Sequence, residues 1–267
     1  MSKVKKLFKG LSLLMKQPSL INKVIDDADV NQMEVIEKYG LKNGLPTIEI
    51  TDLFPDFNET VSPYAALEGG STPIDLAFLK ACAKKFKECV YLEIGTWRGE
   101  SVANIAPIAK KCYTINLTDE QMTAIQLTQK HVDLIGFYSK KHANITHIRE
   151  SSEKFNFKSL NEKVDVAFID GDHHYEAVKN DTEKVFEILK DSSSIIVWHD
   201  YGNTPEDIRW DVLKGILAGT PENKRKYLYR VSNTLCAIYC EQELKGTFHT
   251  FPRESEKYFE INVQVKK

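Results

Sequence analysis

Hydrophobic and polar positions follow two different periods between residues 73 and 240. Short apolar runs bounded by turn-forming residues predict five strands, at residues 89–94, 112–117, 145–149, 164–169 and 194–198. Longer segments with apolar positions at helical spacing predict helices between them, at residues 74–87, 100–110 and 175–190. Strands that alternate with helices of this length indicate a mostly parallel sheet that helices cover on both faces.

The pattern changes near the end of this part of the chain. Residues 227–231 and 235–240 predict two further strands, and only Ser232, Asn233 and Thr234 separate them. A link this short fits an antiparallel hairpin and cannot hold a parallel crossover. The predicted fold is therefore of the α/β class, with a doubly wound, mostly parallel, seven-stranded sheet of the Rossmann-like type that ends in an antiparallel hairpin.

The first 73 residues are organised differently. Apolar residues at helical spacing run from Leu7 to Ile36, and the glycines and prolines that follow predict a long connection over residues 45–73. We expect three parts: an N-terminal helical extension with its connection at residues 1–73, a main domain at residues 74–241, and a C-terminal extension at residues 242–267.

Five lysines and no acidic residue occur among the first 20 positions, interspersed with apolar residues. A basic amphipathic helix of this kind can bind an anionic membrane surface or pack on the body of its own protein, and packing is the favoured interpretation. The apolar stretch is short, is interrupted by Gly10 and lacks a small-residue cleavage site, so it does not fit a secretory signal peptide.

Composition and charge narrow the class of protein. The 267 residues include 36 Lys or Arg and 38 Asp or Glu, for a formal charge of -2, and this balance argues against a nucleic-acid partner. No apolar run approaches the ~18 residues that a membrane span needs. The five cysteines form no C-x-x-C pair, so we expect buried free thiols in a reducing cytoplasm rather than disulfides or structural zinc.

The first chemical motif is LEIGTWRGES, at residues 92–101. A strand brings Glu93 to its end, Gly95 supplies a tight turn, and Gly99 lets the next helix begin close to the sheet. In an open α/β sheet, ligands bind beyond the carboxyl ends of the strands, where free helix N–H groups also lie. A carboxylate there suits a cationic amine better than a pyrophosphate. The plainer interpretation is an ordinary strand–turn–helix corner.

Two later motifs place acidic and imidazole groups at the ends of consecutive predicted strands. They are FIDGDHHYE at residues 168–176 and IVWHDYGN at residues 196–203. Asp and His are costly to bury unless they are paired or bound to a cation, so their convergence indicates a divalent metal site or an acid–base site. One Asp acting as a helix cap would explain either motif alone, but it poorly explains both at adjoining strand ends.

Together these motifs resemble the class I S-adenosylmethionine-dependent methyltransferases, and within them the metal-dependent O-methyltransferases of sugars and other small molecules. The resemblance covers roughly residues 74–241 and includes the reversed strand at the end of the sheet. It implies that this part is a cofactor-binding catalytic domain. It further implies an enzyme that methylates a hydroxyl group of a saccharide or a glycosylated small molecule.

The resemblance also implies where S-adenosylmethionine binds. The loop that holds its methionine part corresponds to Glu93, Gly95, Thr96, Trp97, Gly99 and Ser101. Asn116 stands where the family usually has an acid that bonds the ribose, with Asp119 or Glu120 as alternatives. Ser151 and Ser152 match the position beside the adenine.

The metal ligands implied by the resemblance are Asp170, His199 and Asp200. Mg²⁺ is the expected ion, but an imidazole at His199 suits Mn²⁺, Fe²⁺ or Zn²⁺ better, so these ions remain alternatives. Asp172 occupies the position of the general base, with His173 as a competing candidate.

The acceptor and the partners are less defined. Tyr201, Arg209 and Trp210 are candidates for the wall of the acceptor site, although packing of a helix at residues 205–217 is favoured for Trp210. The expected partner is a small-molecule or glycan acceptor, and the sequence leaves a homo-oligomer open. Two other functions remain as alternatives: a non-haem iron oxygenase on the same fold, and a non-catalytic binding module.

Overall fold

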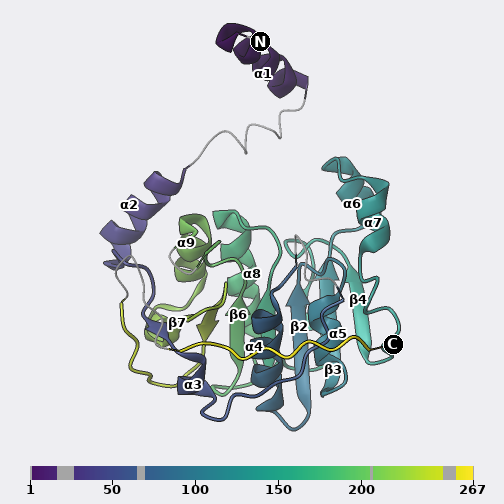
Figure 1. Cartoon of the computed structure of the whole chain (residues 1–267), viewed down its shortest axis with the longest axis vertical. Helices are drawn as coiled ribbons and strands as arrows, with labels where there is room; N and C mark the ends of the chain where they lie inside the picture. The colour runs from purple at the N-terminus through teal and green to yellow at the C-terminus, as the bar shows by residue number, and fades with distance from the viewer. Residues whose placement is uncertain (1, 17–26, 65–69, 205–206, 249–256, 267) are drawn as a thin grey trace.

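The computed structural model describes residues 2–16, 27–64, 70–204, 207–248 and 257–266 (Figure 1). Its strands form one sheet: β1 (Thr47–Ile48), β2 (Cys89–Ile94), β3 (Ala109–Asn116), β4 (Ile145–Arg149), β5 (Val166–Ile169), β6 (Ile195–Trp198), β7 (Leu228–Val231) and β8 (Ala237–Tyr239). The helices are α1 (Lys3–Lys16), α2 (Ala28–Tyr39), α3 (Ile50–Leu53), α4 (Pro73–Lys84), α5 (Glu100–Ile105), α6 (Asp119–Ala124), α7 (Gln129–Leu134), α8 (Tyr175–Ile188) and α9 (Trp210–Gly219). Two short 3₁₀ helices span Phe157–Ser159 and Glu222–Tyr227.

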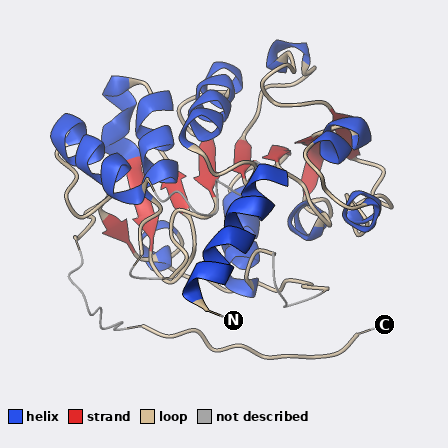
Figure 2. Ribbon diagram, turned by 90° about the horizontal axis from the view of Figure 1, so that it is seen from above, coloured by secondary structure: helices blue, strands red, loops and turns tan. Residues whose placement is uncertain are grey.

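The sheet has the order β1-β7-β8-β6-β5-β2-β3-β4, and helices lie on both of its faces (Figure 2). Strands β2 to β6 pair in parallel, and β7 and β8 form an antiparallel hairpin, so the predicted fold class is confirmed. Only β8 is reversed, because it inserts between β6 and β7 and runs antiparallel to both. All seven predicted strands form, and β1 adds an eighth that pairs in parallel with β7.

The central strands are buried on both sides, which explains their continuous apolar character. Every residue of β2, β5 and β6 is buried. Along β2, Leu92 packs on the face that α8 and α9 cover, whereas Tyr91 packs on the face that α4 and α5 cover. The strands are therefore held from both sides, and their carboxyl ends are fixed relative to one another.

Helix boundaries follow local chemistry. Thr118 and Gln121 form a capping box that begins α6. The helix predicted at residues 100–110 ends at Ile105, because Pro107 has no N–H group to donate the hydrogen bond that would continue the helix. The helix predicted at residues 205–217 begins at Trp210, and residues 205–206 lie outside the described residues.

The N-terminal extension differs from the predictions in two ways. None of the residues of α1 is buried, so the interpretation of this segment as a helix packed on the body is wrong. The apolar positions expected to continue its pattern at residues 20–25 lie outside the described residues. The segment predicted as a long connection holds β1 and α3. No helix in the described ranges is long and apolar enough to span a bilayer, and all five cysteines are buried free thiols.

Candidate active site

The carboxyl ends of β5 and β6 bring Asp170 and Asp200 to the same edge of the sheet. Asp170 follows directly on β5, and its N–H donates to the carbonyl of Ile94 in β2 at 2.8 Å. Asp200 adopts a left-handed backbone conformation with φ at 54°, which a residue other than glycine rarely does. About a quarter of each side chain is exposed, at 24% for Asp170 and 22% for Asp200. The two carboxylates are therefore accessible at the end of the buried strands.

His173 completes a cluster with these two carboxylates. Its Nε2 lies 2.7 Å from Oδ2 of Asp200 and 3.8 Å from Oδ1 of Asp170. One ligand atom from each of the three residues lies within 4.8 Å of the others, which is the spacing of a metal site. We call Asp170, His173 and Asp200 the Asp–His–Asp cluster. His173, predicted as a candidate base, thus lies among the groups that could hold an ion.

His199 lies beneath this cluster and is nearly buried, with 6% of its side chain exposed. Its Nδ1 lies 3.2 Å from Oδ1 of Asp170 and 3.3 Å from Oδ2 of Asp200. Its other nitrogen, Nε2, lies 3.4 Å from Oδ2 of Asp75, a fully buried carboxylate in the first turn of α4. Sequence reasoning missed Asp75. Its only local signal is the capping box that it forms with Thr72.

Two imidazole nitrogens face the carboxylates without being aligned for hydrogen bonds. Nε2 of His173 and Nδ1 of His199 are both buried, and neither has a hydrogen-bond partner in the described part of the chain. A divalent cation between such nitrogens and two carboxylates would use all of these donors at once. The residues present therefore fit a metal, with a mixed oxygen and nitrogen donor set that suits Mn²⁺, Fe²⁺ or Zn²⁺.

The electrostatics of the cluster favour a positive charge. Burial alone would lower the pKa of His173, but Asp170 and Asp200 outweigh it and raise the pKa to about 9. Burial would raise the pKa of Asp200, yet the two imidazoles hold it well below its ordinary value. Arg209, one of the predicted acceptor-site residues, adds a third cation with Nη1 3.5 Å from Oδ1 of Asp200. Asp200 thus stays ionised, and the cluster attracts either a metal or protons on the imidazoles.

Asp172, the predicted base, does not join this cluster. Its Oδ1 accepts the backbone N–H of His174 at 2.8 Å and also contacts the imidazole of His174. Burial would raise the pKa of Asp172, but these interactions with His174 lower it. Its side chain is 59% exposed, so an acceptor could reach it. Its catalytic role stays a prediction.

Glu93 holds the loop after β2 in place. It is 1% exposed and accepts hydrogen bonds from Thr96 at 2.6 Å, Ser101 at 2.7 Å and Tyr91 at 3.0 Å. Burial raises the pKa of its carboxyl group against these three bonds. All three donors are hydroxyl groups, and two of them belong to residues predicted to bind the cofactor. In this structure Glu93 positions the loop from below and does not face an open space.

Two glycines allow the loop to pack tightly. Gly95 has φ at 94°, and a Cβ there would overlap the carbonyl oxygen of Asp170. Gly99 has φ at 80°, and a Cβ there would overlap the hydroxyl of Ser139. The loop is therefore pressed against the strand end that carries Asp170 on one side and against the segment after α7 on the other.

Trp97 fixes the far side of the loop. Its ring stacks on His131 of α7 at 5.6 Å between centroids, and the guanidinium of Arg98 lies 4.5 Å from the Trp97 ring. The carbonyl of Trp97 accepts the N–H of Gly136 at 2.6 Å. These contacts join the loop to α7 and place both beside the end of β3.

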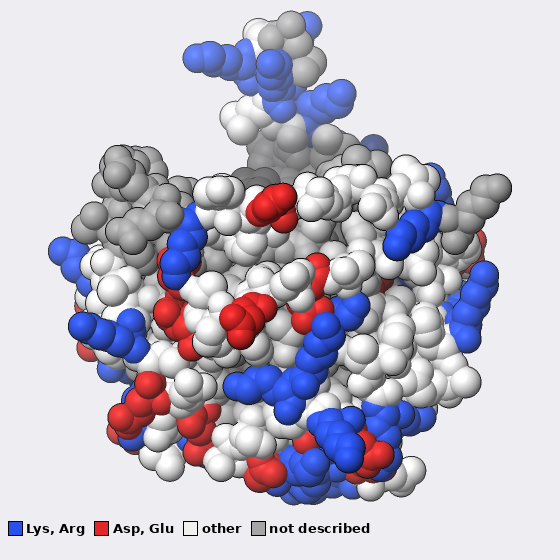
Figure 3. Space-filling model, turned by 60° about the horizontal axis from the view of Figure 1, so that its bottom comes forward, with Lys and Arg blue, Asp and Glu red and all other residues white. Residues whose placement is uncertain are grey.

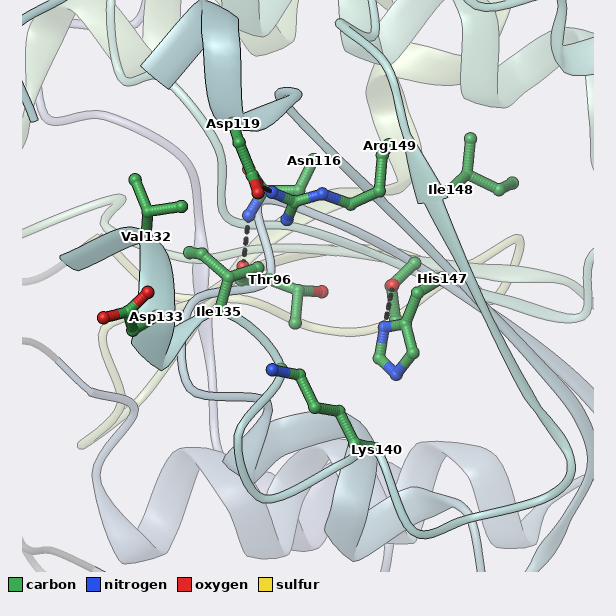
Figure 4. Close-up of a pocket in the computed structure, with 12 residues that line it drawn as sticks. Thr96, Asn116, Asp119, Val132, Asp133, Ile135, Lys140, His147, Ile148 and Arg149 are labelled. Atoms are coloured by element: carbon green, nitrogen blue, oxygen red, sulfur yellow. Dashed lines mark hydrogen bonds and ion pairs between the residues drawn. The ribbon is translucent and has the colours of Figure 1, made fainter. Parts of the chain in front are cut away.

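A cavity of about 360 Å³ opens between this loop, the ends of β3 and β4, and α7 (Figure 4). Its lining is Thr96, Thr114, Asn116, Asp119, Val132, Asp133, Ile135, Gly136, Lys140, His147, Ile148 and Arg149. At one end Asn116 donates to the carbonyl of Thr96 at 2.5 Å, next to an ion pair between Asp119 and Arg149. At the other end His147 bonds Thr114 at 2.8 Å. Polar side chains and charged side chains of both signs thus surround a space of the size that small ligands occupy.

Several predicted residues lie outside this lining. Ser151 and Ser152 follow β4, and Ser152 bonds the buried carboxyl of Asp181 on α8 rather than facing the cavity. Of the two alternatives to Asn116, Asp119 lines the cavity and Glu120 does not.

Of the three residues after β6 that were predicted to line the acceptor site, two pack in the core and one faces the Asp–His–Asp cluster. Tyr201 is 1% exposed, and its hydroxyl accepts the N–H of Leu45 at 2.9 Å, so it packs in the core instead of lining an acceptor site. Trp210 packs against the same core, as the favoured interpretation predicts. Arg209 alone of the three faces Asp200.

Comparison with known proteins identifies the domain that carries these groups. Residues 92–201, from Leu92 beside Glu93 in β2 to Tyr201 directly after Asp200, match the family model of a methyltransferase domain. The chain contains an S-adenosylmethionine-dependent methyltransferase domain. This result favours the methyltransferase interpretation over an oxygenase or a non-catalytic module. A search of the curated proteins finds no match to the chain.

Solved structures with a similar chain path include several methyltransferases. The O-methyltransferase NovP is 12% identical, with a TM-score of 0.47, over 63% of this chain and 80% of NovP. An rRNA methylase from Streptococcus thermophilus is 16% identical, with a TM-score of 0.42, over 65% of this chain and 96% of that one. The N-methyltransferase NodS from Bradyrhizobium japonicum, solved with S-adenosyl-L-homocysteine, is 14% identical, with a TM-score of 0.38, over 57% of this chain and 74% of that one. At these values the likenesses say nothing about the acceptor of the present methyltransferase domain.

Proposed function

We propose that the protein is an O-methyltransferase that uses a divalent metal and methylates a hydroxyl group of a saccharide or a glycosylated small molecule. The observation that carries the proposal is the Asp–His–Asp cluster beside the glycine loop of the methyltransferase domain. Gly95 of that loop lies directly against the backbone of Asp170, so cofactor and metal would share one edge of the sheet.

The cavity beside Asn116 supports a position for the nucleoside of the cofactor. Asn116 ends β3, the strand next to β2, and its amide can hydrogen-bond a ribose hydroxyl. The methionine part would then extend along residues 95–99 towards Asp170. Methyl transfer from a sulfonium to an oxygen is an in-line displacement, so much of the rate enhancement comes from holding the acceptor in line with the methyl group.

Asp170, His173 and Asp200 would hold the metal, and Nδ1 of His199 would add a further donor from below. When bound, the ion would supply a fixed position for an acceptor hydroxyl and a lower pKa of that hydroxyl. In this arrangement His173 serves as a ligand and is not available as the base.

Asp172 then remains as the residue that accepts the proton. It is two residues from Asp170 on the same loop, it is exposed, and its pKa is lowered, so it is ionised near neutral pH. A well-placed general base contributes roughly 10²–10⁴-fold to the rate. Aligning Asp172 with an acceptor would require it to release the imidazole of His174.

Two measurements test the proposed function. Thermal unfolding with S-adenosylhomocysteine should show stabilisation by about 2.7 kcal/mol when the ligand is at 100 times its dissociation constant. Mn²⁺ should stabilise the wild type separately, and Asp200→Asn should lose the Mn²⁺ effect while it keeps the effect of S-adenosylhomocysteine. Failure of Mn²⁺ to bind the wild type would remove the metal from the proposal.

The acceptor is tested by product analysis. The protein is incubated with methyl-labelled S-adenosylmethionine and a panel of glycans, glycosylated metabolites and simple phenols. We expect label on a sugar hydroxyl that depends on added metal. Transfer to a phenol alone, or to a nitrogen, would contradict the proposed substrate class while leaving the methyltransferase domain intact.

A further inference from the structure

Helix α1 carries a continuous apolar stripe along one side. At 100° per residue, six residues at helical spacing fall within about a third of the circumference: Val4, Leu7, Phe8, Leu11, Leu14 and Met15. The exposed fraction reaches 62% at Leu7, 66% at Phe8 and 84% at Met15. A stripe of this length and width on a globular protein is normally covered.

Lysines occupy five of the eight remaining positions of the same helix. All five charged residues of α1 are lysines, and no acidic residue occurs within it. Lys5 and Lys16 flank one border of the stripe and Lys3 flanks the other, so positive charge lies on both sides of it. Figures 1 and 3 show the helix standing apart from the rest of the chain, with lysine side chains on its surface in Figure 3. The whole chain has a formal charge of -2, so the remainder of the protein is net acidic.

Nothing in the described part of the chain covers α1. None of its residues is buried, and no hydrogen bond or ion pair joins one of its side chains to another described element. A helix of 14 residues with a glycine inside it is marginal in water by itself. A surface that buries the stripe would therefore stabilise the helical conformation of α1 and hold the helix on that surface.

We propose that α1 binds the surface of an anionic lipid bilayer and attaches the methyltransferase domain to it. In this mode the helix lies in the plane of the interface, with the stripe in the acyl boundary and the lysine ammonium groups among lipid phosphates. The lysines on both borders of the stripe match a planar anionic surface. A second copy of α1 fits less well, because pairing two stripes would bring two rows of lysines together. The inference is independent of the acceptor and of the metal.

The experiment is co-sedimentation of the full-length protein with vesicles, without any activity assay. Vesicles of phosphatidylcholine alone are compared with vesicles that contain about 30% phosphatidylglycerol, at low salt and at roughly 0.5 M salt. We expect binding to the anionic vesicles only, weakened at least tenfold at the higher salt. Replacing two lysines, as in Lys5→Gln with Lys9→Gln, should weaken binding about tenfold or more.

Leucines on two sides of the helix provide a matched pair of variants. Leu7→Gln removes an apolar side chain from the stripe, whereas Leu13→Gln makes the same change on the lysine side of α1. We expect about a tenfold loss of binding for Leu7→Gln and less than a twofold change for Leu13→Gln. Analytical ultracentrifugation of the same proteins without lipid reports self-association.

Three results would overturn the proposal. The first is a protein that stays in the supernatant with anionic vesicles, and the second is equal binding to neutral vesicles. The third is a dimer in solution that Leu7→Gln dissociates while vesicle binding is absent, since α1 would then be a dimerisation helix.

Discussion

Asp75 and His199 lie 124 residues apart in the chain and meet beneath the Asp–His–Asp cluster, with Oδ2 of Asp75 3.4 Å from Nε2 of His199. Asp75 is fully buried, and the backbone N–H groups of Thr72 and Leu235 also donate to it. When Nε2 of His199 carries the proton and donates it to Asp75, Nδ1 of the same ring has no proton. The lone pair of Nδ1 then points at Asp170 and Asp200. Carboxylates orient metal-binding histidines in this way in many metal sites.

Replacing Asp75 should therefore weaken metal binding, although Asp75 itself is not a ligand of the metal. In Asp75→Asn, the new amide can donate to Nε2 of His199, so the imidazole proton moves to Nδ1 and blocks that donor. We expect the Mn²⁺ affinity to fall by about 10–100-fold in calorimetric titration. The matched control is Asp52→Asn, because Asp52 has the same capping-box position on α3 and is exposed. Equal Mn²⁺ affinity in both variants would show that Asp75 acts only as a helix cap.

The packing of the glycine loop makes a prediction about stability. Gly95→Ala would place a Cβ against the carbonyl of Asp170 in a backbone conformation that alanine disfavours. We expect the free energy of unfolding to fall by about 2–4 kcal/mol in urea denaturation. Gly171→Ala serves as the control, since its nearest neighbour would be a side-chain carbon of Ile94 at 3.5 Å. That variant should be unchanged or up to about 1 kcal/mol more stable.

Asp172 is the residue whose role rests most on the sequence. Asp172→Asn keeps the shape of the side chain and removes its ability to accept a proton, so turnover should fall by roughly 10²–10⁴-fold. The dissociation constant of S-adenosylhomocysteine, measured by calorimetry, should stay within about twofold of the wild type, because Asp172 does not line the cavity. Glu176→Gln alters a second exposed acid at the start of α8 and should leave turnover unchanged. An active Asp172→Asn enzyme would exclude this residue as the base.

Asp181 makes stability depend on pH. It is 2% exposed, and burial raises the pKa of its carboxyl from 3.8 to about 6 despite bonds from Ser152 and Asn180. Because the folded-state pKa is the higher one, the protonated form stabilises the fold fully below pH 4, and this stability is lost as the pH rises through 6. The cost at pH 7 is on the order of 2 kcal/mol.

Asp181→Asn removes this dependence. The variant should be more stable than the wild type at pH 7, by on the order of 2 kcal/mol, and should gain much less at pH 4.5. Urea denaturation at both pH values measures the difference. Asp191→Asn, at an exposed acid in the loop between α8 and β6, should show no such gain at pH 7. A uniform gain of Asp181→Asn at both pH values would point to packing instead of ionisation.

The sequence predicted the parts of the molecule that local pattern determines. Buried parallel strands read as continuous apolar runs, so all seven predicted strands form and Asp170 and Asp200 end two neighbours of the sheet. The sequence did not predict whether the imidazole of His173 or that of His199 faces the carboxylates from the exposed side. That choice depends on how the chain turns after Gly171. His173 therefore lies in the Asp–His–Asp cluster and His199 lies below it.

Residues whose partners are distant in sequence were harder to predict. Asp75 reads as an ordinary helix-capping residue, and only the assembled fold brings it to His199. Glu93 was expected to face the cofactor, but three hydroxyl groups surround it. β1 was missed because two residues are too few to show a period.

β1 also has a consequence for shortened versions of the protein. The N–H groups of Arg230 and Ser232 donate to carbonyls of Pro46 and Ile48, and Thr47 exchanges two further bonds with Thr247. A version that starts near residue 74 would lose these partners and leave the backbone of β7 open to solvent. Unpaired strand edges form hydrogen bonds with other chains and cause aggregation. The truncated protein should therefore precipitate during expression, even though it retains every residue of the methyltransferase match.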